Sequence, residues 1–201
     1  MKKADKLYVV ARDASEKNKK VGINAVNELA QEKMTNEGLL YVVATTAKAK
    51  DVRIEAVKNI ISEGLLCVVA TKAAGEYKDV GIEAVNRLKE AQNWSANVAI
   101  CAEEESVSDL AMKKLTDQHW LANVALCAAN GSVRAAAIDK IDNALLLIHI
   151  VQNSKDNIVK GLARAKVQDV SNNDIIVDKD GELVESEDTG DIFIEIEDLL
   201  N

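Results

Sequence analysis

The sequence predicts an all-α protein of stacked helix pairs, an α-solenoid, followed by a small acidic tail with β character. Three observations predict this fold. Apolar residues recur at helical spacing, and the whole pattern repeats about every 26 residues. The composition, with no proline and only 3% aromatic residues, favours helices over an all-β fold. We therefore expect about six helix pairs in residues 1–168 and a separate acidic tail in residues 169–201.

The first helix of each pair carries a leucine, then Val-Ala at +3 and +4, then a small residue at +7. These offsets line one stripe of a helix, and the small residue lets a second helix approach closely. The pattern occupies residues 7–14, 40–47, 66–73, 95–102 (with serine in place of leucine), 121–128 and, in degenerate form, 147–154.

The second helix carries a valine, then a small residue at +4, an aliphatic one at +5 and Leu or Ile at +8. We expect positions 0, +1, +4, +5 and +8 of this helix to be buried. The pattern occupies residues 21–29, 52–60, 80–88, 107–115, 133–141 and, more weakly, 159–167. Its starts are 31, 28, 27, 26 and 26 residues apart, and we assign the longer early spacings to insertions in connecting loops.

The repeats match most closely between Gln92–Asp117 and Gln118–Asn143. Trp94 and Trp120 coincide at a shift of 26 residues, as do Cys101 and Cys127. An ordinary helical bundle has no reason to keep such a register, so the repeat favours stacked pairs over a bundle. We expect both tryptophans to pack at repeat junctions.

The tail holds most of the negative charge. The chain has a formal net charge of −8, yet residues 171–201 contain eleven carboxylates and only one cation, Lys179, which leaves +2 for residues 1–170. Asp174–Val177 and Glu182–Val184 are the expected strands of a hairpin and flank Asp178–Gly181, a strong turn signal; Ile192–Glu197 alternates like a third strand. A lone hairpin is marginally stable, so we expect its apolar face to pack on the last helices or along the groove. A solvated, unstructured tail is the alternative.

Two of the second helices resemble those of the HEAT-repeat family in its short bacterial form. The resemblance rests on Asp51-Val52-Arg53 with Ala56-Val57 and Ile60, on Val133-Arg134 with Ala137-Ile138 and Ile141, and on the junction Lys114–Gln118. It covers roughly residues 5–167. The sequence departs from the family pattern at Gly22, Gly81 and Ser108, where the arginine is missing, and in its lack of proline. The resemblance implies a right-handed superhelix whose second helices line a concave surface, and a scaffold or binding role.

Positions +2, +3 and +6 of the second helices should point away from the core. From them we select six candidate partner-binding residues, Ile23, Asn27, Ile54, Lys58, Ile82 and Asn86, which we call the isoleucine row. Three isoleucines in register on adjacent helices form an apolar strip that needs a cover. The cover is either a partner protein or the chain's own acidic tail. The alternative is that superhelical twist buries the isoleucines against a neighbouring helix.

Catalytic, cofactor and metal sites are not indicated. His119 and His149 have no carboxylate or nucleophile at an informative spacing, and the three cysteines lack C-x-x-C spacing. We expect Cys67, Cys101 and Cys127 to be small core or half-buried residues. Asp178 and its neighbours fit part of a calcium loop, but Ile176 occupies the first ligand position.

The expected function is a non-enzymatic scaffold that binds another protein. The resemblance also admits a HEAT-like bilin lyase or a HEAT-like nucleic-acid-binding protein. Nucleic acid would need a basic stripe, whereas Lys58, Arg87 and Lys113 are sparse and are interrupted by Glu55, Glu83 and Asp109. The diiron members of the family are excluded because this sequence has no repeated His-Glu pairs.

The expected location is the cytoplasm. Apolar runs such as Ala144–Val151 are far shorter than the roughly 20 residues a membrane span needs, and the first residues include no apolar signal segment. We expect a monomer, because the ends of the stack can be capped by the tail and by the first helix with Lys2, Lys3, Lys6 and Arg12.

Overall fold

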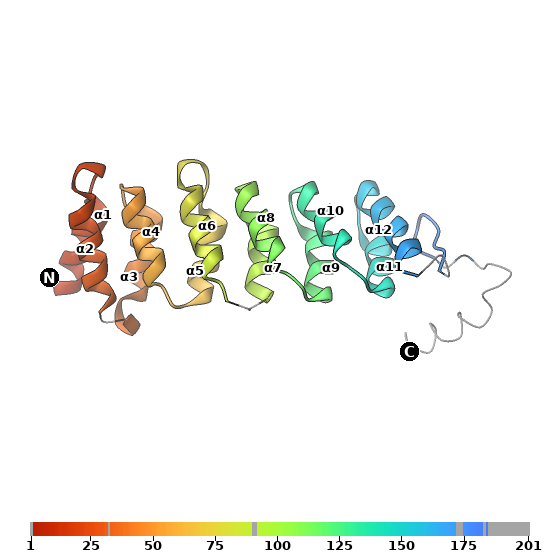
Figure 1. The fold of residues 1–201 in the computed structure, drawn as a ribbon, viewed down its shortest axis with the longest axis horizontal. Coiled ribbons are helices and arrows are strands. Elements are labelled where there is room, and N and C mark those ends of the chain that lie inside the picture. The colour runs from red at the N-terminus through yellow and green to blue at the C-terminus, as the bar shows by residue number, and fades with distance from the viewer. Residues whose placement is uncertain (1, 32, 90–91, 172–174, 183, 185–201) are drawn as a thin grey trace. The chain divides into compact units, whose positions relative to one another are not determined.

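The computed structural model describes residues 2–31, 33–89, 92–171, 175–182 and 184 (Figure 1). These residues are helical, as the sequence predicts, and contain no strand. The helices are α1 (Lys3–Asp13), α2 (Lys19–Ala30), α3 (Lys33–Thr46), α4 (Lys50–Asn59), α5 (Glu63–Lys72), α6 (Lys78–Arg87), α7 (Gln92–Cys101), α8 (Glu105–Lys113), α9 (Gln118–Cys127), α10 (Gly131–Asp139), α11 (Ala144–Asn153) and α12 (Asn157–Val170). Two 3-10 turns, η1 (Glu16–Asn18) and η2 (Gly75–Tyr77), precede α2 and α6.

The chain divides into two compact units. The first unit, residues 1–115, contains α1 to α8, and the second unit, residues 116–201, contains α9 to α12 and the described part of the tail. The sequence does not predict this division, because the helix patterns continue through it without a break in composition. The boundary near residue 168 that we expect from composition stays a prediction.

The first unit is built from four helix pairs stacked in sequence order. Within each pair the two helices pack on one another, as α1 does on α2 and α3 on α4. Each first helix also packs on the first helix of the next pair, and each second helix on the next second helix (Figure 1). The unit therefore has one layer of first helices and one layer of second helices.

Glycine at position +1 of a second helix allows neighbouring pairs to approach closely. A Cβ atom on Gly22 would lie 2.6 Å from the Cβ of Ala14 and 2.8 Å from the Cγ2 of Val52 in the next pair. Gly81 is equally confined, because its Cβ would lie 2.9 Å from the Cβ of Ala73 and 3.0 Å from a methyl of Val107. The two glycines that depart from the arginine pattern are thus sites of close approach.

Arginine at the same position has a different role. Arg53 donates from Nη1 to the Thr45 carbonyl at 2.8 Å and from Nε to the Ala47 carbonyl, at the end of α3. Arg134 donates from Nη1 to the Ala128 carbonyl at 2.7 Å, just after α9. The last carbonyls of a helix have no partner within the helix, and a cation there satisfies them and opposes the helix dipole.

Cations at position +7 cap the preceding second helix. Arg87 donates from Nη2 to the Ile60 carbonyl at 3.0 Å. Lys114 donates from Nζ to the carbonyls of Val85 and Leu88 at 2.7 and 2.6 Å. Consecutive pairs of the first unit are therefore joined by hydrogen bonds as well as by apolar packing.

The buried stripe expected in every pair fails at the first one. Val10 is 42% exposed and Val21 is 54% exposed, although both occupy core positions of the repeat. Their counterparts in the later pairs of this unit are buried: Val43, Val69 and Val98 for Val10, and Val52, Val80 and Val107 for Val21. A core position needs a preceding pair to cover it, and no described helix precedes α1. The first helix pair therefore exposes an apolar edge.

The second unit contains the two pairs α9 with α10 and α11 with α12, and these pairs also pack on each other. Side chains preceding each helix cap its first N–H groups: Asp117 for α9, Asn130 for α10, Asn143 for α11 and Asp156 for α12. Such caps define where the helices begin.

The predicted turn at Asp178–Gly181 is present and lies against α11. The Asp178 N–H donates to the Glu182 carbonyl at 2.9 Å, and the Val184 N–H donates to the Ile176 carbonyl at 2.8 Å. Gly181 has a φ of +88°, which favours glycine, and its carbonyl accepts a hydrogen bond from Gln152. Val177 is buried. The expected strand Ile192–Glu197 lies outside the described residues.

Candidate protein-interaction surface

The isoleucine row lies on three adjacent helices of the first unit. Ile23 is on α2, Ile54 on α4 and Ile82 on α6, and α2, α4 and α6 pack on one another in that order. All three isoleucines are half-buried. One turn further along the same helices, the remaining members of the row, Asn27, Lys58 and Asn86, are exposed as expected.

The burial of the row falls between the two interpretations offered by the sequence. Full exposure would have left the isoleucines uncovered, and a strong twist would have removed them from the surface. Half-burial means that neighbouring helices cover part of each side chain and that the rest reaches the surface. The row ends at α8, where Asp109 occupies the equivalent position and is also half-buried.

Polar groups along the row contact one another. The Asn59 amide donates to the Glu55 carbonyl at 2.9 Å and approaches Asn27 Oδ1 at 3.5 Å. Lys58 Nζ lies 3.9 Å from a carboxylate oxygen of Glu55. Together with half-buried Glu83, these groups give the row a mixed character with carboxylates beside the isoleucines. That character differs from the continuous basic stripe that a nucleic acid requires.

The exposed edge of the first pair is a second apolar surface in this unit. Val10 of α1 and Val21 of α2 are exposed, as are Lys2, Lys3 and Lys6 of the same pair. The first pair therefore exposes both apolar and charged side chains.

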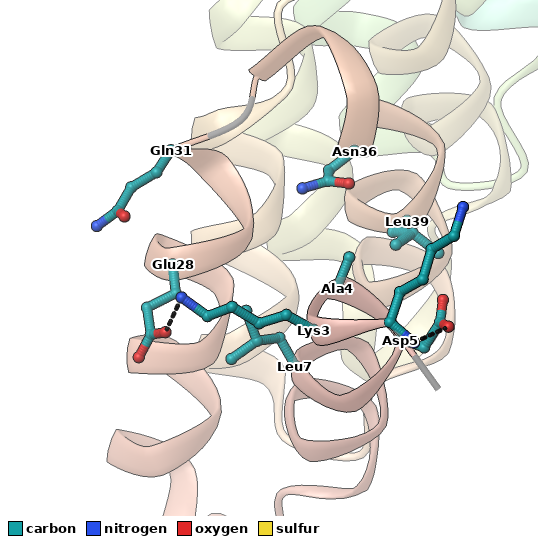
Figure 2. Close-up of a pocket in the computed structure, with 9 residues that line it drawn as sticks. Lys3, Ala4, Asp5, Leu7, Glu28, Gln31, Asn36 and Leu39 are labelled. Carbon is teal, nitrogen blue, oxygen red and sulfur yellow. Dashed lines mark hydrogen bonds and ion pairs between the residues drawn. The ribbon is translucent and has the colours of Figure 1, made fainter.

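A cavity of about 460 Å³ opens between α1, α2 and α3 (Figure 2). Several polar groups that line the cavity contact one another or nearby backbone groups. Lys3 reaches toward Glu28, with 3.4 Å between Nζ and Oε2, and Asp5 accepts a hydrogen bond from the Lys2 backbone N–H at 3.0 Å. Asn36 donates to the Leu29 carbonyl at 3.0 Å. The described lining has no cysteine, serine or histidine, and its charged residues Lys3, Asp5 and Glu28 make contacts within the wall.

A smaller cavity of about 210 Å³ lies beside Arg53 and Tyr77. The Arg53 guanidinium stacks on the Tyr77 ring at 3.5 Å from its centroid and also holds the carbonyls at the end of α3. Burial lowers the pKa of Arg53 from its usual range. The charge at this cavity is thus used to join two helix pairs, and the site is structural.

One of the three cysteines is placed as expected, and the other two are not. Cys67 is buried, and burial raises the pKa of its thiol to about 11, which keeps it protonated at neutral pH. Cys101 and Cys127 are exposed, which corrects their expected placement in or near the core. Each is the last residue of its helix and lies at +6 of the repeat, off the buried stripe at 0, +3, +4 and +7.

The tryptophans and histidines were the remaining residues of interest in the sequence. Trp94 is half-buried, and its ring lies 3.6 Å from the Cβ position of Gly64 on the preceding first helix, which confirms its expected place at a repeat junction. His119 and His149 are exposed. Within the described residues, no group of three or more His, Cys, Asp or Glu side chains is arranged to hold a metal ion.

No protein-family model, curated protein or solved structure matches this chain. The resemblance to the HEAT-repeat family therefore stays a prediction from the residues. None of the helices in the described part of the chain combines the length and the apolar character needed to cross a membrane.

Sequence reasoning missed two features of the surface. Val10 and Val21 follow the same pattern as their buried counterparts, and only their place in the stack exposes them. The cation at position +7 is an arginine in one repeat, Arg87, and a lysine in another, Lys114, so the position has no single residue type. A comparison of charge across the repeats, in addition to apolar character, would have identified the cation at +7.

Proposed function

We propose that this chain is a non-enzymatic scaffold, an α-solenoid of HEAT type whose second helices present the isoleucine row to another protein. One observation carries the proposal. Three half-buried isoleucines occupy equivalent positions on three packed helices, and exposed Asn27, Lys58 and Asn86 flank them. Repeat proteins use such extended rows as binding surfaces.

The spacing of the row suggests the partner's chemistry. Packed helices lie roughly 8–10 Å apart, so the isoleucines repeat at about that distance. A segment in the polyproline II conformation rises about 3.1 Å per residue with three residues per turn, so it would meet the row with an apolar residue at every third position. The exposed amides of Asn27 and Asn86 would then bind backbone or polar groups of the same segment.

The lyase and nucleic-acid alternatives receive no specific support. In the larger cavity Lys3 and Glu28 pair with each other, and Arg87 is engaged with the Ile60 carbonyl. We retain a cytoplasmic monomer as part of the proposal.

The test compares the wild type with the triple variant I23Q/I54Q/I82Q in affinity capture from a lysate. We expect the triple variant to capture at least about tenfold less of a partner protein than the wild type captures. Ile61→Gln is the matched control, since Ile61 is a 55% exposed isoleucine of the same unit outside the row, and it should capture normally.

Circular dichroism checks that the triple variant folds. Lys58→Glu gives a second test that does not depend on the isoleucines, because an exposed residue can change charge without unfolding the helix. Equal capture by the wild type, the triple variant and Lys58→Glu would contradict the proposal.

A further inference from the structure

The last helix carries apolar residues on its outer face. In α12, the buried face consists of Val159, Ala163 and Val167. The opposite face exposes Ile158, Gly161, Leu162 and Ala165, which we call the α12 strip. These four residues follow the spacing i, i+3, i+4 and i+7, so they form one continuous line on the helix. Ile158 is 74% exposed and Leu162 is 41% exposed.

The repeat itself does not require the α12 strip. Ile158 occupies the position just before the first valine of the second-helix pattern, where the other five repeats have Lys20, Asp51, Asp79, Ser106 and Ser132. Leu162 occupies position +3, where the other five repeats have Asn24, Glu55, Glu83, Leu110 and Ala136, so only the sixth repeat has a large apolar residue at both positions. These two residues indicate a local contact.

Cations flank the α12 strip on both sides. Lys166 lies along one side of the helix, Lys160 and Arg164 lie along the other, and Lys155 precedes the cap Asp156 at its start. Lys155 and Arg164 are exposed, and neither forms an ion pair within the described residues.

The acidic residues of α12 and its cap are already engaged. Asp156 accepts from the backbone N–H of Ile158 at 2.8 Å and from Arg134 at 2.8 Å. Asp169 lies 3.6 Å from Lys166. The surface around the strip is therefore apolar at its centre and basic at its margins.

The chain contains one segment of complementary composition. Residues 185–201 hold seven carboxylates and no lysine or arginine, and they include Ile192, Phe193, Ile194, Ile196, Leu199 and Leu200. The segment lies outside the described residues. Its negative charge complements the cations beside the α12 strip, and its apolar side chains match the exposed Ile158 and Leu162.

The segment also starts in the right unit. It follows Val184, whose N–H binds the Ile176 carbonyl in the turn held on α11 by Gln152. α11 packs on α12. The eight residues from Val184 to Ile192 can span up to roughly 26–29 Å. That reach exceeds the length of α12, which is about 21 Å for its 14 residues.

We propose that residues 192–200 of the same chain dock on the α12 strip, with their carboxylates beside Lys155 and Arg164. The docked segment covers Ile158 and Leu162. The proposal goes beyond the binding role of the isoleucine row. It also leaves the row to another protein, because Glu55 and Glu83 beside the isoleucines repel an acidic segment.

Hydrogen exchange of the full chain, followed by mass spectrometry, tests the proposal. In the wild type we expect residues 192–200 to exchange at least about tenfold more slowly than an unstructured peptide. The double variant I158E/L162E should lose this protection, while Ile61→Glu in the first unit should keep it. Added salt should weaken the protection, because exposed charges are screened.

A second variant distinguishes loss of docking from unfolding of α12. E195Q/E197Q removes two charges from the segment and leaves α12 unchanged, and it should also speed exchange at residues 192–200. Exchange at the unstructured rate in the wild type would overturn the proposal, as would protection that survives I158E/L162E. Protection that disappears on dilution would assign the segment to a second copy and would overturn docking within one chain.

Discussion

Position +1 of the second helices shows how single residues determine the distance between repeats. Gly22 and Gly81 let Val52 and Val107 approach a backbone that a Cβ atom would block. Arg53 and Arg134 instead reach the carbonyls at the end of a first helix. The same position thus joins repeats either by close packing or by hydrogen bonds to a helix end.

Gly81→Ala tests the close approach. The added methyl would lie 2.9 Å from Ala73 and 3.0 Å from Val107, and overpacking of this kind costs about 1–3 kcal/mol. Alanine is better than glycine in a helix by roughly 1 kcal/mol, which offsets part of that cost. We expect a net loss of stability of about 1 kcal/mol in chemical denaturation.

Gly38→Ala is the matched control in the same unit. Gly38 is exposed in α3 and would have no atom within 4 Å of an added Cβ, so alanine should stabilise the protein by about 0.5–1 kcal/mol. Equal effects of the two substitutions would contradict the close approach at Gly81.

Part of this residue-level detail could be predicted. The helical stripe correctly placed Val52, Val80 and Val107 in the core. It failed for Val21, because burial at that position depends on a preceding helix pair and the pattern within one repeat contains no information about its neighbours. Gly22 and Gly81 were visible only as departures from an arginine pattern, and their function became clear from the distances.

At the scale of the helix, the caps at the ends of the second helices are harder to predict than the helices themselves. Lys114 closes the end of α6 by donating to the carbonyls of Val85 and Leu88 from one repeat further along the chain. The cap depends on an approach between residues more than 25 positions apart in sequence. Local capping rules do not include such partners.

Lys114→Met tests this cap. Hydrogen bonds from a charged donor contribute about 1.5–3 kcal/mol, and the carbonyls of Val85 and Leu88 would lose theirs. Burial lowers the pKa of Lys114, so desolvation already offsets part of the gain. We therefore expect the free energy of unfolding, measured by chemical denaturation, to fall by about 1.5–2 kcal/mol, near the lower end of that range. Lys20→Met, at an exposed lysine of α2, should change stability by less than about 0.5 kcal/mol.

The turn in the tail should respond to acid. Asp178 Oδ1 accepts hydrogen bonds from the backbone N–H of Glu182 at 3.0 Å and of Asp180 at 2.8 Å, and these bonds lower the pKa of Asp178. A lowered carboxyl pKa stabilises the folded turn above the ordinary value of about 3.9. The contribution is lost as the pH falls through the folded-state pKa.

We therefore expect amide protection at Asp180 and Glu182, measured by NMR, to decrease below about pH 4. Asp178→Asn keeps the acceptor oxygen without a titrating proton, so its protection at these amides should not change over the same range. Equal protection of these amides at pH 2 and pH 6 in the wild type would show that the charge of the Asp178 carboxylate does not stabilise the turn.

At the scale of the whole chain, the repeat was the most informative part of the sequence. It predicted an all-helical structure, and the order of packed pairs within each unit agrees with it. The division after residue 115 was not predictable, because it depends on how densely neighbouring pairs pack and not on their pattern. The positions of the isoleucine row followed from the repeat, whereas the half-burial of Ile23, Ile54 and Ile82 depends on packing between helices.

The isoleucine row and the α12 strip differ in the charges around them. Glu55 and Glu83 lie beside the isoleucines of the row, whereas cations such as Lys155 and Arg164 lie near the α12 strip. An acidic segment therefore fits the strip better than the row. On this account the tail and the partner protein occupy different surfaces, in different units.

Site-specific photo-crosslinking in the full chain tests the central claim most directly. A photoreactive side chain would replace Ile54 in one sample and Ile61, exposed in the same unit, in the other. After irradiation in lysate, we expect position 54 to form an adduct with one other protein, and position 61 to form at least about tenfold less of it. Adducts of equal yield at the two positions, or an adduct at 54 with the chain's own tail, would contradict the account.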